Sequence, residues 1–318
     1  MQNPDFAVEA TGLVKTFGAT RAVDGIDLQI PRGRVFGVLG PTGTGKTTLL
    51  KMLATLLPID GGRASILGVD VASHPHEVRR LIGVTGQYAA VDDHLTGREN
   101  LMLFGCLLGL PRTRAAAIAE ELLASVGLTD AATTLTREYS GGMRRRLGLA
   151  ASLISRPPLI LLDEPTTGLD PRTRGQLWGT IRQLVRDGAT VLFTTQSLDE
   201  AQLADRIAVI ERGNKVAEGT PDELKAGIGS STLHIRLEDR ARVSEAAGLV
   251  TRVLGREPML TQAGALDIAL PDANRAADVL IAFRQARLGI TTANVRQPTL
   301  GFLALTGAPT EVPIRQVA

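Results

Sequence analysis

The stretch Gly40-Pro41-Thr42-Gly43-Thr44-Gly45-Lys46-Thr47 decides the fold of this chain. It has the pattern of a glycine, four residues, Gly-Lys and a hydroxyl residue, which is typical of a loop that binds the phosphates of a nucleoside triphosphate. The apolar run Val35 to Leu39 before it predicts a buried strand, and the residues that follow, through Leu53, have helical spacing. A strand, this loop and a helix in that order are the context that the motif requires.

The chemistry of this loop follows from its residue types. Glycines let backbone N–H groups close around phosphate oxygens, and the helix that begins near Lys46 points its positive dipole end at them. Lys46 then reaches the β- and γ-phosphates, and the Thr47 hydroxyl is offered to Mg²⁺. We therefore expect ATP to be bound by Gly40, Pro41, Thr42, Gly43, Thr44, Gly45, Lys46, Thr47 and the next residue, Thr48.

A second strand with acidic residues at its end is Leu159-Ile160-Leu161-Leu162-Asp163-Glu164. Four consecutive apolar residues predict a strand buried on both faces, as in a parallel sheet, with Asp163 at its carboxyl end beside the phosphate loop. There Asp163 would hold Mg²⁺ through water. Glu164 would orient and deprotonate the water that attacks the γ-phosphate.

A second anion site is predicted at Tyr139-Ser140-Gly141-Gly142-Met143, which leads into a helix from Arg144 to about Ile154. Ser140 is a natural N-cap, and the two glycines after it expose backbone N–H groups at a helix start. Two phosphate-binding helix ends, one with a lysine and one without, resemble the ATP-binding cassette (ABC) family. The resemblance implies an α/β P-loop NTPase fold with a helical subdomain, in which two cassettes face each other and hold ATP between them.

The resemblance assigns roles to further residues. Lys46 of one cassette and Ser140, Gly141 and Gly142 of the other would bind each ATP, as would Asp163. Phe17 falls where the family places an aromatic ring against adenine, although ordinary core packing is the alternative for this residue. Gln87 falls where a glutamine senses Mg²⁺ and the attacking water. Asp170, in Gly168-Leu169-Asp170, matches the loop that crosses the dimer interface.

The chain departs from the family pattern at three places. Tyr139 and Met143 stand where the signature loop has Leu and Gln, and both changes leave the serine and glycines in place. Thr42 and Thr44 replace the usual Asn and small residue of the phosphate loop. Gln196 replaces a histidine after the strand Val191 to Thr195; its amide can donate a hydrogen bond to the γ-phosphate but cannot carry a positive charge. Slower or less pH-sensitive hydrolysis is one expected consequence.

Within the family, the chain is similar to the daunorubicin/doxorubicin-resistance type of drug-export ATPase, in which Gln at the switch position is usual. The similarity is carried by Gln196 and by the segments 139–146, 86–92 and 302–307; one departure is that 298–303 lacks the acidic residues common there. It implies an exporter subunit that hydrolyses ATP to move a drug-like or lipid-like hydrophobic substrate through a separate membrane permease. The implied catalytic residues are Glu164, Gln196 and Lys46, and the implied Mg²⁺ ligands are Thr47, Gln87 and Asp163.

Composition bounds the partners and the location. The chain has 318 residues, 44% of them hydrophobic, and a net charge of +2, which gives no basic field for nucleic acid. Its single cysteine, Cys106, excludes an internal disulfide. The longest apolar run, Leu101 to Leu110, is about half of a membrane span. Asp5 and Glu9 interrupt any apolar start that a signal peptide would need. We expect a bacterial peripheral protein on the cytoplasmic face of the cell membrane, bound to a permease and to a second copy or a related cassette.

Two domains are expected along the chain. Residues 1–228 would form the cassette, with a helical subdomain at about 93–155, and 229–318 a small α+β accessory domain in the order βαββαβ, after a Gly/Ser linker. A regulatory or dimer-stabilising role, a ligand sensor and a passive stability domain all remain open for it.

The run Arg144 to Arg146 must spread around its helix, so either one arginine packs inward on a solvated face or the run contacts ATP or a partner.

An alternative function belongs to another class, a soluble cassette ATPase that acts on nucleic acid or ribosomes. Such proteins usually carry two cassettes in one chain, long coiled-coil insertions, zinc fingers or basic tails. The sequence shows none of these features. The exporter subunit is therefore the preferred hypothesis.

Overall fold

The computed structural model describes residues 5–86, 91–227, 232–260, 265–270 and 274–296. They belong to two compact units, Met1–Pro221 and Asp222–Ala318, which are described separately below. The helix α8 (Pro221–Gly227) begins at the last residue of the first unit.

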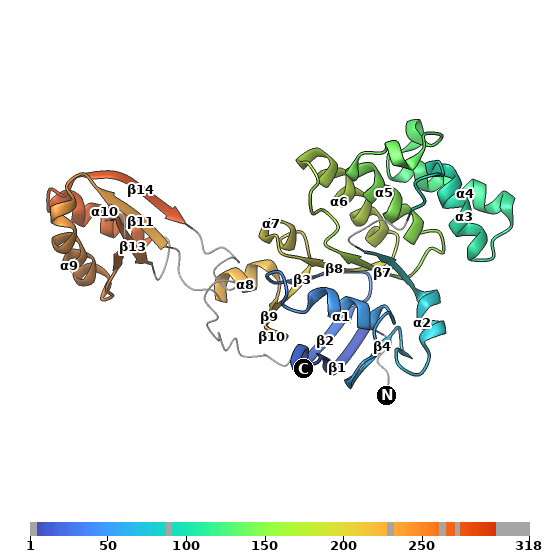
Figure 1. Ribbon diagram of the computed structural model, residues 1–318. Helices are drawn as coiled ribbons and strands as arrows, with labels where there is room; N and C mark the ends of the chain where they lie inside the picture. The colour runs from blue at the N-terminus through green and yellow to red at the C-terminus, as the bar shows by residue number, and fades with distance from the viewer. Residues whose placement is uncertain (1–4, 87–90, 228–231, 261–264, 271–273, 297–318) are drawn as a thin grey trace. The chain divides into compact units, whose positions relative to one another are not determined.

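A six-stranded sheet in the order β10-β9-β3-β8-β7-β6 forms the centre of the first unit (Figure 1). Neighbouring strands from β9 to β6 are parallel, and β10 is antiparallel to β9. Every residue of β3, β7 and β8 is buried, which explains the continuous apolar runs of β3 and β7. The strands are β3 (Val35–Leu39), β6 (Ile82–Thr85), β7 (Leu159–Asp163), β8 (Thr190–Thr195), β9 (Arg206–Glu211) and β10 (Asn214–Gly219).

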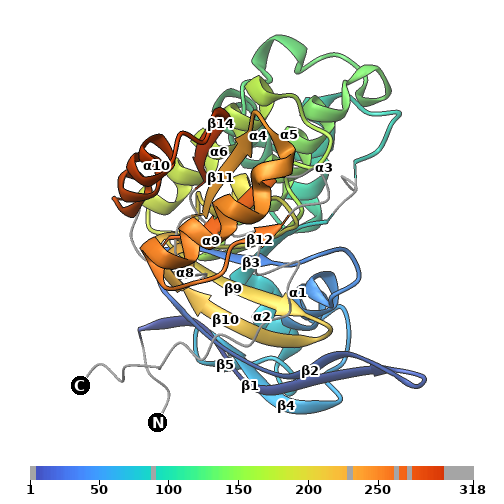
Figure 2. The ribbon, with the colours of Figure 1, turned by 90° about the vertical axis from the view of Figure 1, so that its left-hand side faces the viewer.

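A second, antiparallel sheet in the order β2-β1-β4-β5 lies in the same unit, and Figure 2 shows it below the helix α1. Alternate residues of β2 such as Ile26 and Leu28 are buried, as expected for a strand with one face on a core. Helix α1 packs between the two sheets, because Leu49 and Leu53 share one buried cluster with residues of both. The elements are β1 (Phe6–Phe17), β2 (Thr20–Pro31), α1 (Lys46–Leu53), β4 (Gly61–Ile66), β5 (Val69–Asp70) and the short α2 (Pro75–Leu81).

The opposite face of the parallel sheet is covered by α6 (Pro171–Arg186) (Figure 1). The indole of Trp178 meets the ring of Phe193 on β8 edge to face, with 5.0 Å between ring centroids. The short α7 (Leu198–Ala201) follows β8 and leads into β9. The parallel sheet is therefore enclosed by α1 on one face and α6 on the other.

A helical part is inserted between β6 and β7 and has its own buried cluster, which includes Leu101, Leu123, Tyr139 and Leu147. It consists of α3 (Gly97–Leu107), α4 (Arg112–Ser125), two short 3₁₀ turns (Thr129–Ala131 and Thr136–Glu138) and α5 (Gly141–Ser152). The helix predicted from Arg144 to about Ile154 is present as α5, which begins three residues earlier, directly after its N-cap Ser140. Thr96 and Glu99 form a capping box at the start of α3.

The second unit confirms the predicted order βαββαβ. Its four strands form an antiparallel sheet in the order β12-β13-β11-β14, the arrangement of a split-βαβ sandwich. Buried residues on β11 and β13, such as Ile235 and Ile268, pack with Val250 and Phe283 from the two helices. The elements are β11 (Thr232–Leu237), a 3₁₀ turn (Arg240–Arg242), α9 (Val243–Leu254), β12 (Met259–Leu260), β13 (Ala265–Ala269), α10 (Arg275–Gln285) and β14 (Ile290–Arg296).

Candidate functional site

The phosphate loop connects β3 to α1 and is shaped by glycines. Gly43 and Gly45 have φ angles of 83° and 99°, in the left-handed region that other residues rarely adopt. A Cβ on Gly45 would overlap the carbonyl oxygen of Ala22, and one on Gly40 would overlap that of Ile210. The loop can close this tightly only because these positions carry no side chain.

Lys46 is the first residue of α1 and is only 4% exposed. Its Nζ donates a hydrogen bond to the Pro41 carbonyl oxygen at 2.8 Å and lies 4.0 Å from Oε1 of Glu164. Burial lowers the pKa of Lys46, and the carboxylates of Glu164 and Asp163 oppose that shift. The loop therefore holds one inward-facing cation beside Asp163, the last residue of β7, and Glu164, which follows it.

Asp163 at the end of β7 faces the start of α1, as predicted. Its Oδ1 accepts hydrogen bonds from the Thr47 hydroxyl at 3.0 Å and from the Thr194 hydroxyl at 2.6 Å. This contact is possible because β7 and β3 both pair with β8, so the carboxyl ends of the strands meet at one edge. The site thus brings together a hydroxyl and a carboxylate from segments 116 residues apart.

Glu164 follows directly and has a left-handed backbone, with φ of 47°. Its N–H donates to both the carbonyl oxygen and the hydroxyl of Thr194, at 3.2 and 3.0 Å. Its Oε2 accepts hydrogen bonds from the Thr167 hydroxyl at 3.1 Å and from Nε2 of Gln196 at 3.3 Å. One carboxylate oxygen is therefore held by two donors, while Oε1 faces Lys46.

Gln196, the residue in place of a histidine, links the phosphate loop to Glu164. Its Oε1 accepts a hydrogen bond from the Thr42 hydroxyl at 2.9 Å, which turns its amide nitrogen toward Glu164. Thr42 and Gln196 are two of the departures from the family pattern, and they contact each other. Thr44, another departure, is buried, and its hydroxyl donates to the Pro41 carbonyl oxygen at 2.9 Å.

Sequence reasoning missed Thr194, which is 1% exposed and contacts both Asp163 and Glu164. A threonine inside a buried strand reads as ordinary β packing. The available signal was its position, because it lies directly beside Asp163 in the register of two parallel strands.

Ser140 caps α5 as predicted: its Oγ accepts a hydrogen bond from the N–H of Met143 at 3.2 Å. Ser140 and Gly141 are exposed, and Gly142 packs so closely to Thr173 that a Cβ would lie 2.9 Å from its Cγ2. The three residues thus present a helix N-terminus on the surface of the unit. That these residues bind the ATP of a second cassette stays a prediction.

Tyr139, which replaces the usual leucine, has a structural role. It is 5% exposed, and its hydroxyl donates a hydrogen bond to the Ala131 carbonyl oxygen at 2.6 Å. Burial raises the pKa of Tyr139, so the hydroxyl keeps the proton that it donates. A side chain at Gly97 would collide with this hydroxyl, so the two positions fit as a pair.

Tyr139→Phe is expected to lower the free energy of unfolding by about 1 kcal/mol, because the Ala131 carbonyl loses its donor. Urea unfolding measures this change. ATP turnover should stay within about twofold, since the Ser140 cap does not involve the phenol. Unchanged stability, or a large loss of turnover, would contradict this structural role.

Three further residues, Asp170, Phe17 and Gln87, are also predicted to contact ATP. Asp170 is the N-cap of α6: its carboxylate accepts hydrogen bonds from the N–H and hydroxyl of Thr173, which lower its pKa. Phe17 ends β1 and is 49% exposed, which excludes core packing; Nζ of Lys15 lies 5.6 Å from its ring centroid. Gln87 lies outside the described residues. ATP contact by these three residues stays a prediction.

The geometry defines an α/β P-loop ATPase, with a phosphate loop, a cation and an acidic pair at the carboxyl ends of parallel strands. A family model described as ABC transporter matches residues 23–167. The chain is 50% identical to the daunorubicin/doxorubicin resistance ATP-binding protein DrrA of Streptomyces peucetius, over 97% of this chain and 94% of that protein. It therefore belongs to the ABC transporter family, binds ATP and is an ATPase.

Two other similarities extend this result. The chain is 40% identical to the Nod factor export ATP-binding protein I of Burkholderia lata, over 76% of this chain and 80% of that protein. A solved dimeric ATP-binding cassette in a post-hydrolysis state, bound to ADP and Pi, matches with a TM-score of 0.63 and 26% identity. That match covers 67% of this chain and 98% of the solved one. Among the helices that the structure describes, none is long and apolar enough to span a bilayer.

Proposed function

We propose that this protein is the ATP-hydrolysing subunit of an exporter, and that it energises export of a drug-like or lipid-like hydrophobic substrate. The observation that carries the proposal is the convergence of Lys46 and Gln196 on the carboxylate of Glu164, at 4.0 and 3.3 Å. The names of full-length relatives, which refer to daunorubicin and doxorubicin resistance, support the class of substrate. The place of action is the cytoplasmic face of a bacterial cell membrane.

The residues at the start of α1 and at the end of β7 fit Mg²⁺. Thr47 and Asp163 offer a hydroxyl and a carboxylate oxygen 3.0 Å apart, which are the hard oxygen donors that Mg²⁺ prefers, and Gln87 is a further proposed ligand. Few protein ligands are needed, because Mg²⁺ keeps several waters and binds substrate phosphates. When bound there, Mg²⁺ supplies positive charge to the β- and γ-phosphate oxygens.

The side chains divide the work of hydrolysis as follows. Lys46 exchanges its hydrogen bond to Pro41 for the phosphate oxygens and offsets their charge. Glu164 takes a proton from the attacking water on its carboxylate, whose Oε2 is already held by two donors. The Gln196 amide stays between Glu164 and the phosphate loop and can donate to the γ-phosphate.

The remaining proposed ATP contacts come from residues away from Lys46 and Glu164. Phe17 would stack on adenine, since its ring is exposed, and Asp170 would act at the interface of two cassettes. Ser140, Gly141 and Gly142 would bind the ATP of the second copy or a related cassette. The proposed domain limits are 1–228 for the cassette and 229–318 for an accessory domain that regulates or stabilises the dimer.

The permease is proposed to dock on a groove of about 300 Å³ between β6, α3 and α5. Phe104, Leu107 and Leu108 line it, and the two leucines are 72% and 58% exposed, respectively. An exposed apolar patch of this kind marks a protein interface, and an amphipathic cytoplasmic segment of a permease fits it. Because Ser140 is the N-cap of α5, the groove and the second anion site lie on one helix.

The test is recovery of the tagged protein from its native membranes in mild detergent. A permease with several membrane spans, in equal amount, is the expected partner. Leu107→Asp should lose about 90% or more of that permease, since a charge then replaces an apolar side chain that lines the groove, and should keep ATP binding. The matched control is Leu56→Asp, at a leucine that is 62% exposed outside the groove. Recovery of the protein alone, or with ribosomes or nucleic acid, would contradict the exporter role.

A further inference from the structure

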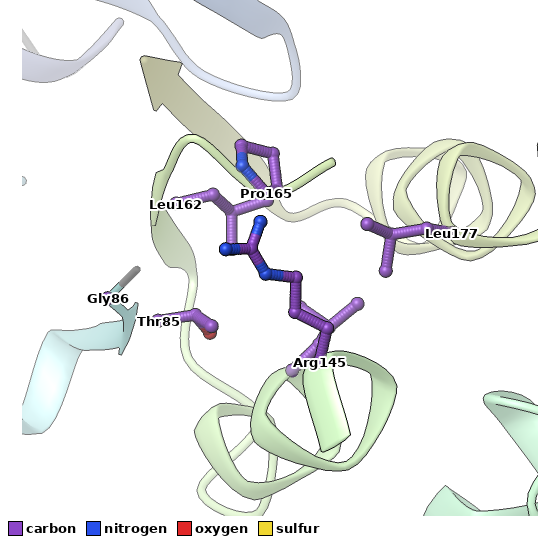
Figure 3. A pocket seen from close by; sticks show the side chains of 7 residues that line it. Thr85, Gly86, Arg145, Leu162, Pro165 and Leu177 are labelled. Carbon is purple, nitrogen blue, oxygen red and sulfur yellow. The ribbon is translucent and has the colours of Figure 1, made fainter. Parts of the chain in front are cut away.

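Arg145 connects the helical part to the backbone of Glu164. It leaves α5 and extends toward the segment that follows β7, and Figure 3 shows its guanidinium close to the side chains of Leu162 and Pro165, which line the same pocket. Its Nη1 donates hydrogen bonds to the carbonyl oxygen of Glu164 at 2.6 Å and to that of Thr167 at 3.0 Å. The arginine run Arg144 to Arg146 therefore has an inward-packing member, one of the two outcomes that the sequence left open.

Glu164, whose carbonyl oxygen Arg145 binds, has a backbone conformation that costs free energy. A left-handed backbone costs a non-glycine residue roughly 1–2 kcal/mol, so the surroundings must maintain it at Glu164. Thr194 fixes the N–H of Glu164, and Arg145 fixes its carbonyl oxygen. The two contacts together set the direction in which the Glu164 side chain leaves the chain.

The guanidinium of Arg145 is part-buried and closely packed on one side. The cavity beside it measures about 10 Å³, which is room for at most about one water molecule. Its apolar walls include Leu149, Leu162 and Leu177. Burial lowers the pKa of Arg145, and the carboxylates of Glu164, Glu200 and Asp163 oppose this shift, so the group remains a cation. A shift of the Arg145 guanidinium is therefore expected to shift the Glu164 backbone as well.

We propose that Arg145 is a positioning residue for ATP hydrolysis, which acts by holding the Glu164 carbonyl and so aims the Glu164 carboxylate. The inference rests on the proposed role of Glu164. The contact also connects α5, which is capped by Ser140 and lines the proposed permease groove, to the acidic residue that activates water. A movement of the helical part would then displace Glu164 through the side chain of Arg145.

The chain offers a matched control in Arg146. Its Nη1 also donates to two backbone carbonyl oxygens, those of Val126 and Gly127, at 2.9 and 3.0 Å. Both acceptors belong to the helical part itself, at the end of α4. Arg145→Met and Arg146→Met therefore remove similar interactions, and only the first reaches Glu164.

The test measures ATP turnover and ATP affinity of the full-length chain. Arg145→Met should lower kcat about 10- to 100-fold with KM for ATP within about twofold, because a misplaced catalytic group costs rate more than binding. Arg145→Lys should restore part of kcat, and Arg146→Met should lower the melting temperature with kcat within about twofold. In a Glu164→Gln background, Arg145→Met should cause no further loss, since both changes act through one carboxylate.

Equal effects of the two methionine variants on kcat, or an independent loss in the Glu164→Gln background, would overturn the positioning role. The outcomes also separate this inference from the proposed function. If Glu164→Gln itself keeps full turnover, the assignment of Glu164 fails. If Glu164→Gln loses turnover and Arg145→Met does not, only the role of Arg145 fails.

Discussion

Glu164→Gln is expected to lower ATP turnover by about 100-fold or more and to leave ATP affinity within about twofold. The amide matches the carboxylate in shape and can still accept the hydrogen bonds of Thr167 and Gln196, so the site keeps its geometry. It cannot take a proton from water. Single-turnover release of phosphate measures the loss, and calorimetric titration with ATP measures the affinity.

The control for this variant is Glu121→Gln, which changes a carboxylate on α4 that pairs with Arg156 on the surface. Its turnover should match that of the unchanged protein. If Glu164→Gln turns over ATP at the same rate as this control, Glu164 does not activate water.

Lys46→Ala is expected to weaken ATP binding by about 10- to 100-fold, the effect of losing a charge-assisted hydrogen bond of roughly 1.5–3 kcal/mol. Two buried carboxylates, Asp163 and Glu164, would then face the phosphates without the Lys46 cation that lies beside them. Turnover falls as a consequence of lost binding. Calorimetric titration of the variant with ATP in the presence of Mg²⁺ checks the prediction.

Lys51→Ala is the matched control, because Lys51 lies on the same helix and is exposed. Its affinity for ATP should not change, since an exposed lysine in the last turn of α1 does not face the phosphate loop. Equal affinity of the Lys46 and Lys51 variants would mean that the loop does not use its lysine for the phosphates.

The parts that sequence reasoning predicted are those with a local signal. The phosphate loop is one, because glycine spacing and a following helix fix its geometry within eight residues. The strand that ends at Asp163 is another, since an unbroken apolar run indicates a strand buried on both faces. The βαββαβ order of the second unit followed from changes in periodicity.

The parts that sequence reasoning did not assign depend on contacts between distant segments. Thr194 acquires its role only when β8 pairs with β7, and Arg145 only when α5 packs near the end of β7. Helical spacing could not say which of three adjacent arginines points inward. Tyr139 was read as a departure from a motif, and its hydrogen bond to Ala131 shows why the fold accepts it.

The phosphate loop has a thermodynamic consequence for nucleotide binding. Its shape is already fixed by hydrogen bonds from the Gly40 N–H to the Thr195 carbonyl oxygen on β8 and from the Thr44 hydroxyl to the Pro41 carbonyl oxygen. A preorganised loop loses little conformational entropy when a ligand arrives, so more of the interaction energy is expressed as affinity. Any ordering that ATP binding does cause can then occur in elements farther from the phosphates. Those are the parts that a transporter must move.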